Sequence, residues 1–214
     1  MPVPVSASPH TPHRHSRLAR LQQAIVFGTL LVLAVWVFWS WRRSGIMVAA
    51  GVLMLLFGYA LVLAVECVAV FRVNRVDPAP RATAAAMIRA WWLEVRTAPA
   101  VFSWRQPFQW RAMPDEAVVP APGATAVVLV HGFVCNRGFW LPWMRELRAR
   151  GVPYTSVNLE PVFGSIDDYR PLIDDAVRRA QALSGCPPLI VCHSMGGLAV
   201  RAWRAATPDA DERV

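Results

Sequence analysis

The sequence predicts an α/β protein in which an N-terminal two-helix transmembrane hairpin precedes the first part of a parallel-sheet core. Three observations predict this class. Two apolar runs without charged interruptions in their centres, residues 21–41 and 46–71, are each long enough to cross a bilayer. From residue 124 onward, short apolar runs alternate with helical patterns, which is typical of a parallel sheet. Within Pro187–Arg201, a short apolar strand, a very tight turn and a helix follow one another.

The composition supports membrane segments and argues against nucleic-acid binding. Hydrophobic residues make up 55% of the 214-residue chain, which is high for a purely soluble protein. All 22 basic residues are arginines, and the net charge is +8. Many of these arginines flank the apolar runs, so membrane topology accounts for much of the charge. The remaining arginines do not alternate with aromatic residues as in a nucleic-acid-binding motif. No nucleic-acid partner is therefore predicted.

The chain divides into four predicted parts. Residues 1–20 form a disordered basic tail whose composition cannot bury a core. Residues 21–71 form the two transmembrane helices. Residues 72–123 form a linker with an amphipathic helix at Thr83–Arg96, which could lie on the membrane surface or pack against the core. Residues 124–214 form the partial α/β domain.

The first apolar run is interpreted as a membrane helix and not as a signal peptide. It is too long, it ends in bulky tryptophans and no cleavage site follows it. A two-helix hairpin places both of its ends on the same side of the bilayer. Three arginines precede the first helix and three follow the second, against two in the connecting loop. The positive-inside rule therefore predicts that both flanks and the α/β domain are cytoplasmic.

Three strands and three helices are predicted in the core, and one or two further strands in Val101–Trp110. Ser165 and Asp168 form a capping box, and Gly151 and Gly185 end two of the helices. The last strand is expected to be buried on both faces, as in a parallel sheet. In chain order, the core elements are strand Thr125–Val130, helix Gly138–Arg150, strand Tyr154–Leu159, helix Ile166–Ser184, strand Leu189–Cys192 and helix Leu198–Ala206.

Ser194 occupies the corner between the last predicted strand and the following helix. A serine at such a corner has its hydroxyl lifted clear of the backbone, and the helix N-terminus points its free N–H groups toward the same place. This is the geometry of the nucleophile elbow, G-x-S-x-G. Cys192 stands where the first glycine of that motif usually stands.

On two segments, the chain resembles the α/β-hydrolase superfamily and, within it, the bacterial lipase-like members. The segments are Cys192–Gly197 and Val127–Phe133, and the resemblance extends from about Ala124 to Val214. It implies an α/β-hydrolase core and hydrolysis of carboxylic esters through an acyl-serine intermediate, with lipid esters favoured by the membrane anchor. It also implies a location at the bacterial inner membrane, with the lipid bilayer and a small-molecule ester as partners.

The resemblance assigns roles to individual residues. Ser194 is the nucleophile, and the backbone N–H groups of Phe133 and Met195 form the oxyanion hole that stabilises the developing negative charge. Neither histidine of the two motifs is predicted to be the general base. No metal site and no cofactor are predicted, and the four cysteines (Cys67, Cys135, Cys186 and Cys192) are expected to be reduced structural thiols. The residues that support the motifs are His131, Gly132, His193 and Gly196.

The remaining triad members are the open question. In this superfamily the nucleophile is followed by an acid and then by a histidine. After Ser194 the sequence offers Asp209, Asp211 and Glu212 but no histidine. The chain is therefore expected to be a fragment of a longer serine hydrolase that lacks the later strands. The strand Leu189–Cys192 is then expected to lie at an exposed, hydrophobic sheet edge. Two alternatives remain: a non-catalytic, truncated membrane protein that binds a partner or a lipid, and a serine that works with a histidine elsewhere or in another subunit.

Three aromatic residues have two interpretations. Trp140, Trp143 and Phe163 could line an acyl pocket beside the nucleophile, or they could be core side chains.

Overall fold

The computed structural model describes residues 16–74, 80–115 and 123–214. It contains two compact units, one formed by residues 106–214 with the chain up to residue 20, the other by residues 21–105. Most of the predicted N-terminal tail and parts of the predicted linker, residues 75–79 and 116–122, lie outside the described residues. Each unit is considered by itself.

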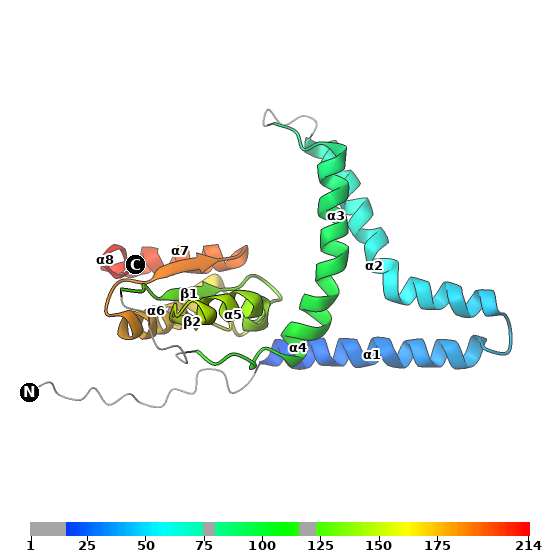
Figure 1. Ribbon diagram of the computed structural model, residues 1–214, viewed down its shortest axis with the longest axis horizontal. Coiled ribbons are helices and arrows are strands. Elements are labelled where there is room, and N and C mark those ends of the chain that lie inside the picture. Colours follow the sequence, from blue (N-terminus) through cyan, green and yellow to red (C-terminus); the bar gives the residue numbers. More distant parts are fainter. Residues whose placement is uncertain (1–15, 75–79, 116–122) are drawn as a thin grey trace, which may run out of the picture. The chain divides into compact units, whose positions relative to one another are not determined.

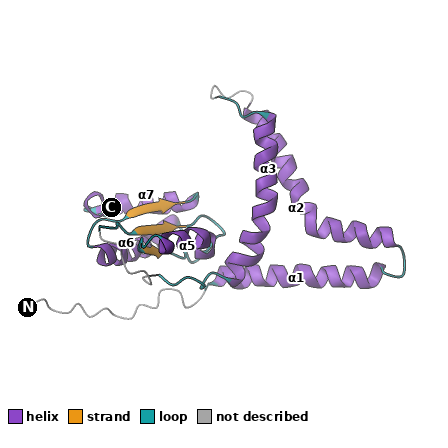
Figure 2. Cartoon of the chain, in the orientation of Figure 1, coloured by secondary structure: helices purple, strands orange, loops and turns teal. Residues whose placement is uncertain are grey.

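The unit of residues 21–105 is helical, as predicted for its first part. Helix α1 (Arg17–Ser40) begins in the other unit, four residues before the predicted start, and α2 (Gly45–Val73) follows it (Figure 2). Both helices are long and apolar enough to cross a membrane. The indole Nε1 of Trp36 donates a hydrogen bond to the carbonyl of Met47 over 3.1 Å. A Cβ at Gly51 would lie within 1.8 Å of that indole, so the glycine is what allows the two helices to approach.

The predicted amphipathic helix is α3 (Ala84–Ala98), with Thr83 as its N-cap. It packs along the second half of α2 (Figure 1), a contact that neither predicted placement included. The hydroxyl of Tyr59 donates to the carbonyl of Val95 over 2.7 Å, and Trp91 Nε1 donates to the carbonyl of Ala60 over 2.9 Å. Polar atoms on apolar helices are satisfied here by the backbone of the neighbouring helix.

The predicted strands in Val101–Trp110 are wrong. Residues Pro99–Arg105 form the π-helix η2 and Gln106–Phe108 form the short helix α4. Pro99 has φ −62° and ψ −38°, which are helical values, so it does not break the helical run.

The other unit is built on a parallel three-stranded sheet in the order β2-β1-β3. The central strand β1 (Val127–Val130) pairs with β2 (Tyr154–Ser156) on one side and with β3 (Leu189–Cys192) on the other. The parallel sheet is as predicted, although β2 is shorter than expected. Because side chains alternate along β1, its two faces support two separate clusters of buried side chains.

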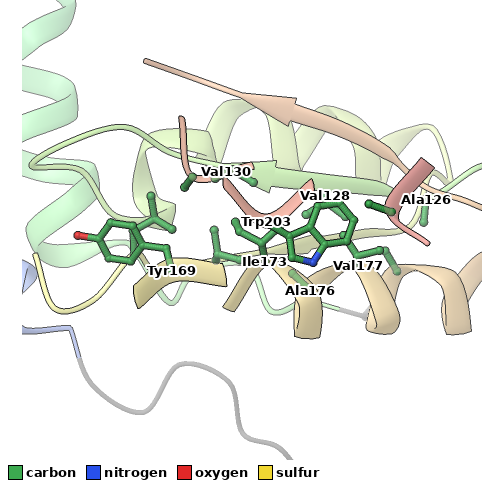
Figure 3. Close-up of a cluster of buried hydrophobic side chains, with 13 residues drawn as sticks. Ala126, Val128, Val130, Tyr169, Ile173, Ala176, Val177 and Trp203 are labelled. Atoms are coloured by element: carbon green, nitrogen blue, oxygen red, sulfur yellow. The ribbon is translucent and has the colours of Figure 1, made fainter. Parts of the chain in front are cut away.

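Helices cover both faces of the sheet. On one face, Val127 and Leu129 pack with Met144 of α5 (Leu141–Ala149). On the other, Val128 and Val130 pack with α6 (Arg170–Ser184) and α7 (Met195–Ala206). Figure 3 shows the indole of Trp203, from α7, lying between Val128 and Val177, and Trp203 is 1% exposed. This layering, helix on sheet on helix, confirms the predicted fold class.

Local signals in the sequence correctly placed the helix ends. Ser165 and Asp168 form the predicted capping box at the 3₁₀ turn η4 (Ile166–Tyr169), which leads into α6. Gly185 ends α6 with φ +70°, and Gly151 follows α5 with φ +66°. The first turn of the other predicted helix is the 3₁₀ turn η3 (Arg137–Trp140).

The last strand is not covered on both faces, as its apolar run alone suggested, and it lies at the exposed sheet edge that was also predicted for it. Leu189 is 60% exposed, and Cys192 is exposed as well. Among the described strands, β3 has β1 as its sole neighbour and lies at the edge of the sheet. The apolar run by itself would fit a covered strand, but β3 lies at the exposed, hydrophobic edge that was expected for it.

Candidate active site

The backbone of Ser194 has an unusual conformation at the junction of β3 and α7. Its φ is 51° and its ψ is −125°, a combination that L-residues with a side chain rarely adopt. Holding one residue in such a region costs about 1–3 kcal/mol and is typical of functional sites. The serine is exposed, and within the described part of the chain its hydroxyl has no hydrogen-bond partner.

Two glycines allow the neighbouring loops to close on this corner. A Cβ at Gly132 would lie 3.0 Å from the Cβ of Ser194 and 2.9 Å from Nδ1 of His193. A Cβ at Gly196 would lie 2.5 Å from the carbonyl oxygen of His131 and 2.8 Å from that of Val130. The structure thus brings together His131, Gly132, His193, Ser194 and Gly196, although sixty or so positions separate the two motifs.

The two predicted oxyanion donors both keep an unused N–H group. At the start of α7, the N–H of Gly196 donates to His193 and that of Gly197 donates to Ser194. Within residues 16–74, 80–115 and 123–214, neither Phe133 N–H nor Met195 N–H has an acceptor. The first N–H groups of a helix are left without intrahelical partners and can bind a negatively charged oxygen.

His131 has a structural role. It is 1% exposed, its Nε2 accepts a hydrogen bond from the N–H of Leu159 over 3.1 Å, and its Nδ1 lies 2.9 Å from the carbonyl oxygen of Gly132. Because a backbone N–H can only donate, the ring proton must be on Nδ1. Both nitrogens are then occupied, so His131 holds the loop after β1 and is not a general base.

His193 also contacts a neighbour through its ring. The imidazole lies 4.6 Å from the Phe139 ring, centroid to centroid, with 30° between the planes. Through this contact, η3 packs against the turn that carries Ser194.

The acids that follow Ser194 are far from it. Asp209 and Asp211 lie beyond the C-terminal end of α7, in a turn and in the short helix α8 (Ala210–Arg213). The 12 residues of α7 span about 18 Å at 1.5 Å per residue. Asp211 forms an ion pair with Arg204 at this distant end. None of these acids is therefore placed to orient a base at Ser194.

The loop after β1 is fixed by a reciprocal pair that sequence reasoning missed. The side chain of Gln106 accepts from the N–H of Asn136 over 2.9 Å, and Asn136 Nδ2 donates to the Gln106 carbonyl over 2.9 Å. Gln106 is completely buried. It also lies 3.8 Å from the Cys135 sulfur, and burial raises the pKa of the Cys135 thiol.

A buried ionic network continues from the same loop. The Arg137 guanidinium is 2% exposed and donates to Ser156 Oγ over 2.7 Å, to the Trp110 carbonyl over 2.8 Å and to the Asp115 carboxylate. Asp115, 3% exposed, also accepts from the N–H of Ser156 over 2.8 Å and pairs with Arg179 over 3.2 Å. No periodic pattern in the sequence signals this network, because Asp115 stands in the predicted linker.

The three aromatic candidates have different surroundings. Trp140 is 4% exposed and belongs to the core, whereas Trp143 is largely exposed. Phe163 is 74% exposed and contacts Phe133 edge to face, with ring centroids 5.7 Å apart. The core interpretation is therefore correct for Trp140. Phe163 instead extends an exposed aromatic surface from the loop after β1.

Among the described residues, no group of three or more His, Cys, Asp or Glu side chains could hold a metal ion.

Comparison with known proteins agrees with this geometry. No curated protein and no solved structure gives a significant match to the chain. Residues 127–214, which run from the start of β1 through the elbow and α7, match the model of the Alpha/beta hydrolase family.

Proposed function

We propose that residues 127–214 provide the nucleophile and the oxyanion hole of a serine hydrolase that cleaves carboxylic esters, and that α1 and α2 anchor it in a membrane. The observation that carries the proposal is the backbone of Ser194, with φ 51° and ψ −125° at a strand-to-helix corner. Strain of this kind persists only where the surrounding structure enforces it. Here Gly132 and Gly196 supply the space that the conformation needs.

The proposed reaction follows the acyl-serine route. Ser194 Oγ attacks the ester carbonyl while a base removes its proton, and the carbonyl oxygen becomes negatively charged. The N–H groups of Phe133 and Met195 donate to that oxygen. The intermediate then collapses, the alcohol leaves with a proton, and water hydrolyses the acyl-serine. Each oxyanion donor contributes about 3 kcal/mol of transition-state stabilisation in comparable enzymes.

The base is assigned to a histidine outside the described residues. His131 is excluded by its two occupied ring nitrogens. His193 packs its ring on Phe139, and within the described residues its side chain makes no hydrogen bond to Ser194. A serine without its histidine keeps only a small residual rate, so turnover depends on that partner.

Lipid esters are the proposed substrates. Two helices of membrane-spanning length precede the hydrolase-like unit in the chain, and an anchored enzyme meets lipid esters at high local concentration. The exposed Phe133–Phe163 pair gives an apolar surface next to a proposed oxyanion donor.

The proposal predicts that a fluorophosphonate probe labels the full-length protein at Ser194. Ser194→Ala should abolish labelling, because the probe reacts only with an activated serine. Ser103→Ala, which removes an exposed serine of η2, is the matched control and should label like the wild type. In-gel fluorescence and peptide mass spectrometry give the readout. Undiminished labelling of Ser194→Ala would contradict the nucleophile assignment.

The absence of a suitable base among the described residues favours one alternative, a non-catalytic membrane protein that binds a partner or a lipid. A folded wild-type protein that never reacts with the probe, even at long exposure, would support this second function.

A further inference from the structure

The space between α2 and α3 holds an apolar groove that has no part in the proposed reaction. Its volume is about 280 Å³, just below the roughly 300–1,000 Å³ of typical ligand pockets. Both helices contribute only apolar side chains to it. Those that carry the argument are Ala64, Cys67 and Phe71 from α2 and Ala84, Met87 and Trp91 from α3.

The groove results from the way the two helices are joined. Hydrogen bonds from Tyr59 and Trp91 hold α2 and α3 together at one end of their contact. Further along the contact, away from Tyr59, the small side chains of Ala64 and Ala84 line the space between the helices and fill little of it. Figure 1 shows the two helices running side by side along this length.

A second cavity adjoins the groove and adds positive charge. It has a volume of about 410 Å³ and shares Phe71 and Met87 with the groove, but its lining also includes Asn74 and Arg81.

We propose that this site binds an anionic phospholipid, with one acyl chain in the groove and the phosphate beside Arg81. An apolar chain in the groove would end next to the guanidinium, and arginine is well suited to phosphate oxygens. Basic pockets between membrane helices recognise anionic headgroups in the same way. The proposal shares with the proposed function only the insertion of α1 and α2 into a membrane, and it requires no catalysis.

The test is a lipid titration of the full chain in detergent, followed by native mass spectrometry. Dioleoylphosphatidylglycerol should bind more tightly than dioleoylphosphatidylcholine, which has the same acyl chains. Arg81→Ala should weaken phosphatidylglycerol binding about five-fold, as expected for about 1 kcal/mol per arginine. Ala64→Leu, which adds bulk to the groove, should weaken the binding of both lipids.

The control variant is Arg89→Ala, which removes an exposed arginine of α3 that lines neither cavity and should leave lipid binding unchanged. Equal binding of the two lipids, or Arg81→Ala behaving like Arg89→Ala, would show a non-selective lipid contact and overturn the proposal. Displacement of the lipid by inorganic phosphate alone would overturn it too, because the acyl chain would then contribute nothing. Probe labelling of Ser194 should be equal in all these variants, so the two proposals can fail separately.

Discussion

Replacing Asp115 with alanine is expected to lower the free energy of unfolding by about 3–5 kcal/mol, the usual cost of breaking a buried ion pair from one side. The substitution leaves the Arg137 guanidinium, 2% exposed, with carbonyl and hydroxyl acceptors but no counter-charge. It also removes the acceptor for the backbone N–H of Ser156 on the edge strand β2. A buried donor without an acceptor adds its own desolvation penalty.

The measurement is urea unfolding of the full chain in detergent, followed by tryptophan fluorescence. Glu146→Ala is the matched control, because the Glu146–Arg150 pair is exposed and such pairs contribute about 0–1 kcal/mol. If Asp115→Ala costs no more than Glu146→Ala, the network does not hold this unit together. Labelling of Ser194 should also slow in Asp115→Ala, because Arg137 directly follows the loop that carries Phe133.

Gly196→Ala is the second substitution with a large expected effect. The added Cβ would lie 2.5 Å from the carbonyl oxygen of His131 and 2.8 Å from that of Val130, and both atoms belong to the backbone. Either the loop after β1 or the start of α7 must move. Overpacking of this kind typically costs about 1–3 kcal/mol. The shift would separate Ser194 from the loop that carries Phe133, so fluorophosphonate labelling should be largely lost.

The adjacent glycine provides the control. A Cβ at Gly197 would meet no atom within 4 Å, and in a helix alanine is about 1 kcal/mol more favourable than glycine. Gly197→Ala should therefore keep its label and unfold at the same or a higher urea concentration. The close approach of the two loops would be refuted if Gly196→Ala and Gly197→Ala gave equal labelling and equal stability.

The features that the sequence predicted well are those with a local cause. The capping box at Ser165, the left-handed Gly185 and the tight turn at Ser194 each depend on a few neighbouring residues. The two long helices were predictable because their length and apolarity are properties of single segments. Local chemistry therefore accounts for most of the element order and for the position of the candidate nucleophile.

The features that the sequence could not predict depend on distant partners. The ion pair between Asp115 and Arg137 joins positions with no repeating pattern between them. Residues 101–105 look like a strand by composition, yet they continue the helical run that starts at α3. The helix against which α3 packs could likewise not be predicted from the pattern of neighbouring residues.

The buried contacts of Gln106 and Asp115 bear on where a shortened version of this protein should begin. The family match begins at residue 127. The compact unit that contains β1, however, includes the chain from Gln106 onward in addition to the start of α1. A fragment trimmed to the matched segment would keep Ser194. It would lose the Trp110 and Asp115 acceptors of Arg137 and the Gln106 acceptors of Asn136. Any shortened version intended for crystallisation or activity measurements should therefore include the chain from Gln106 onward.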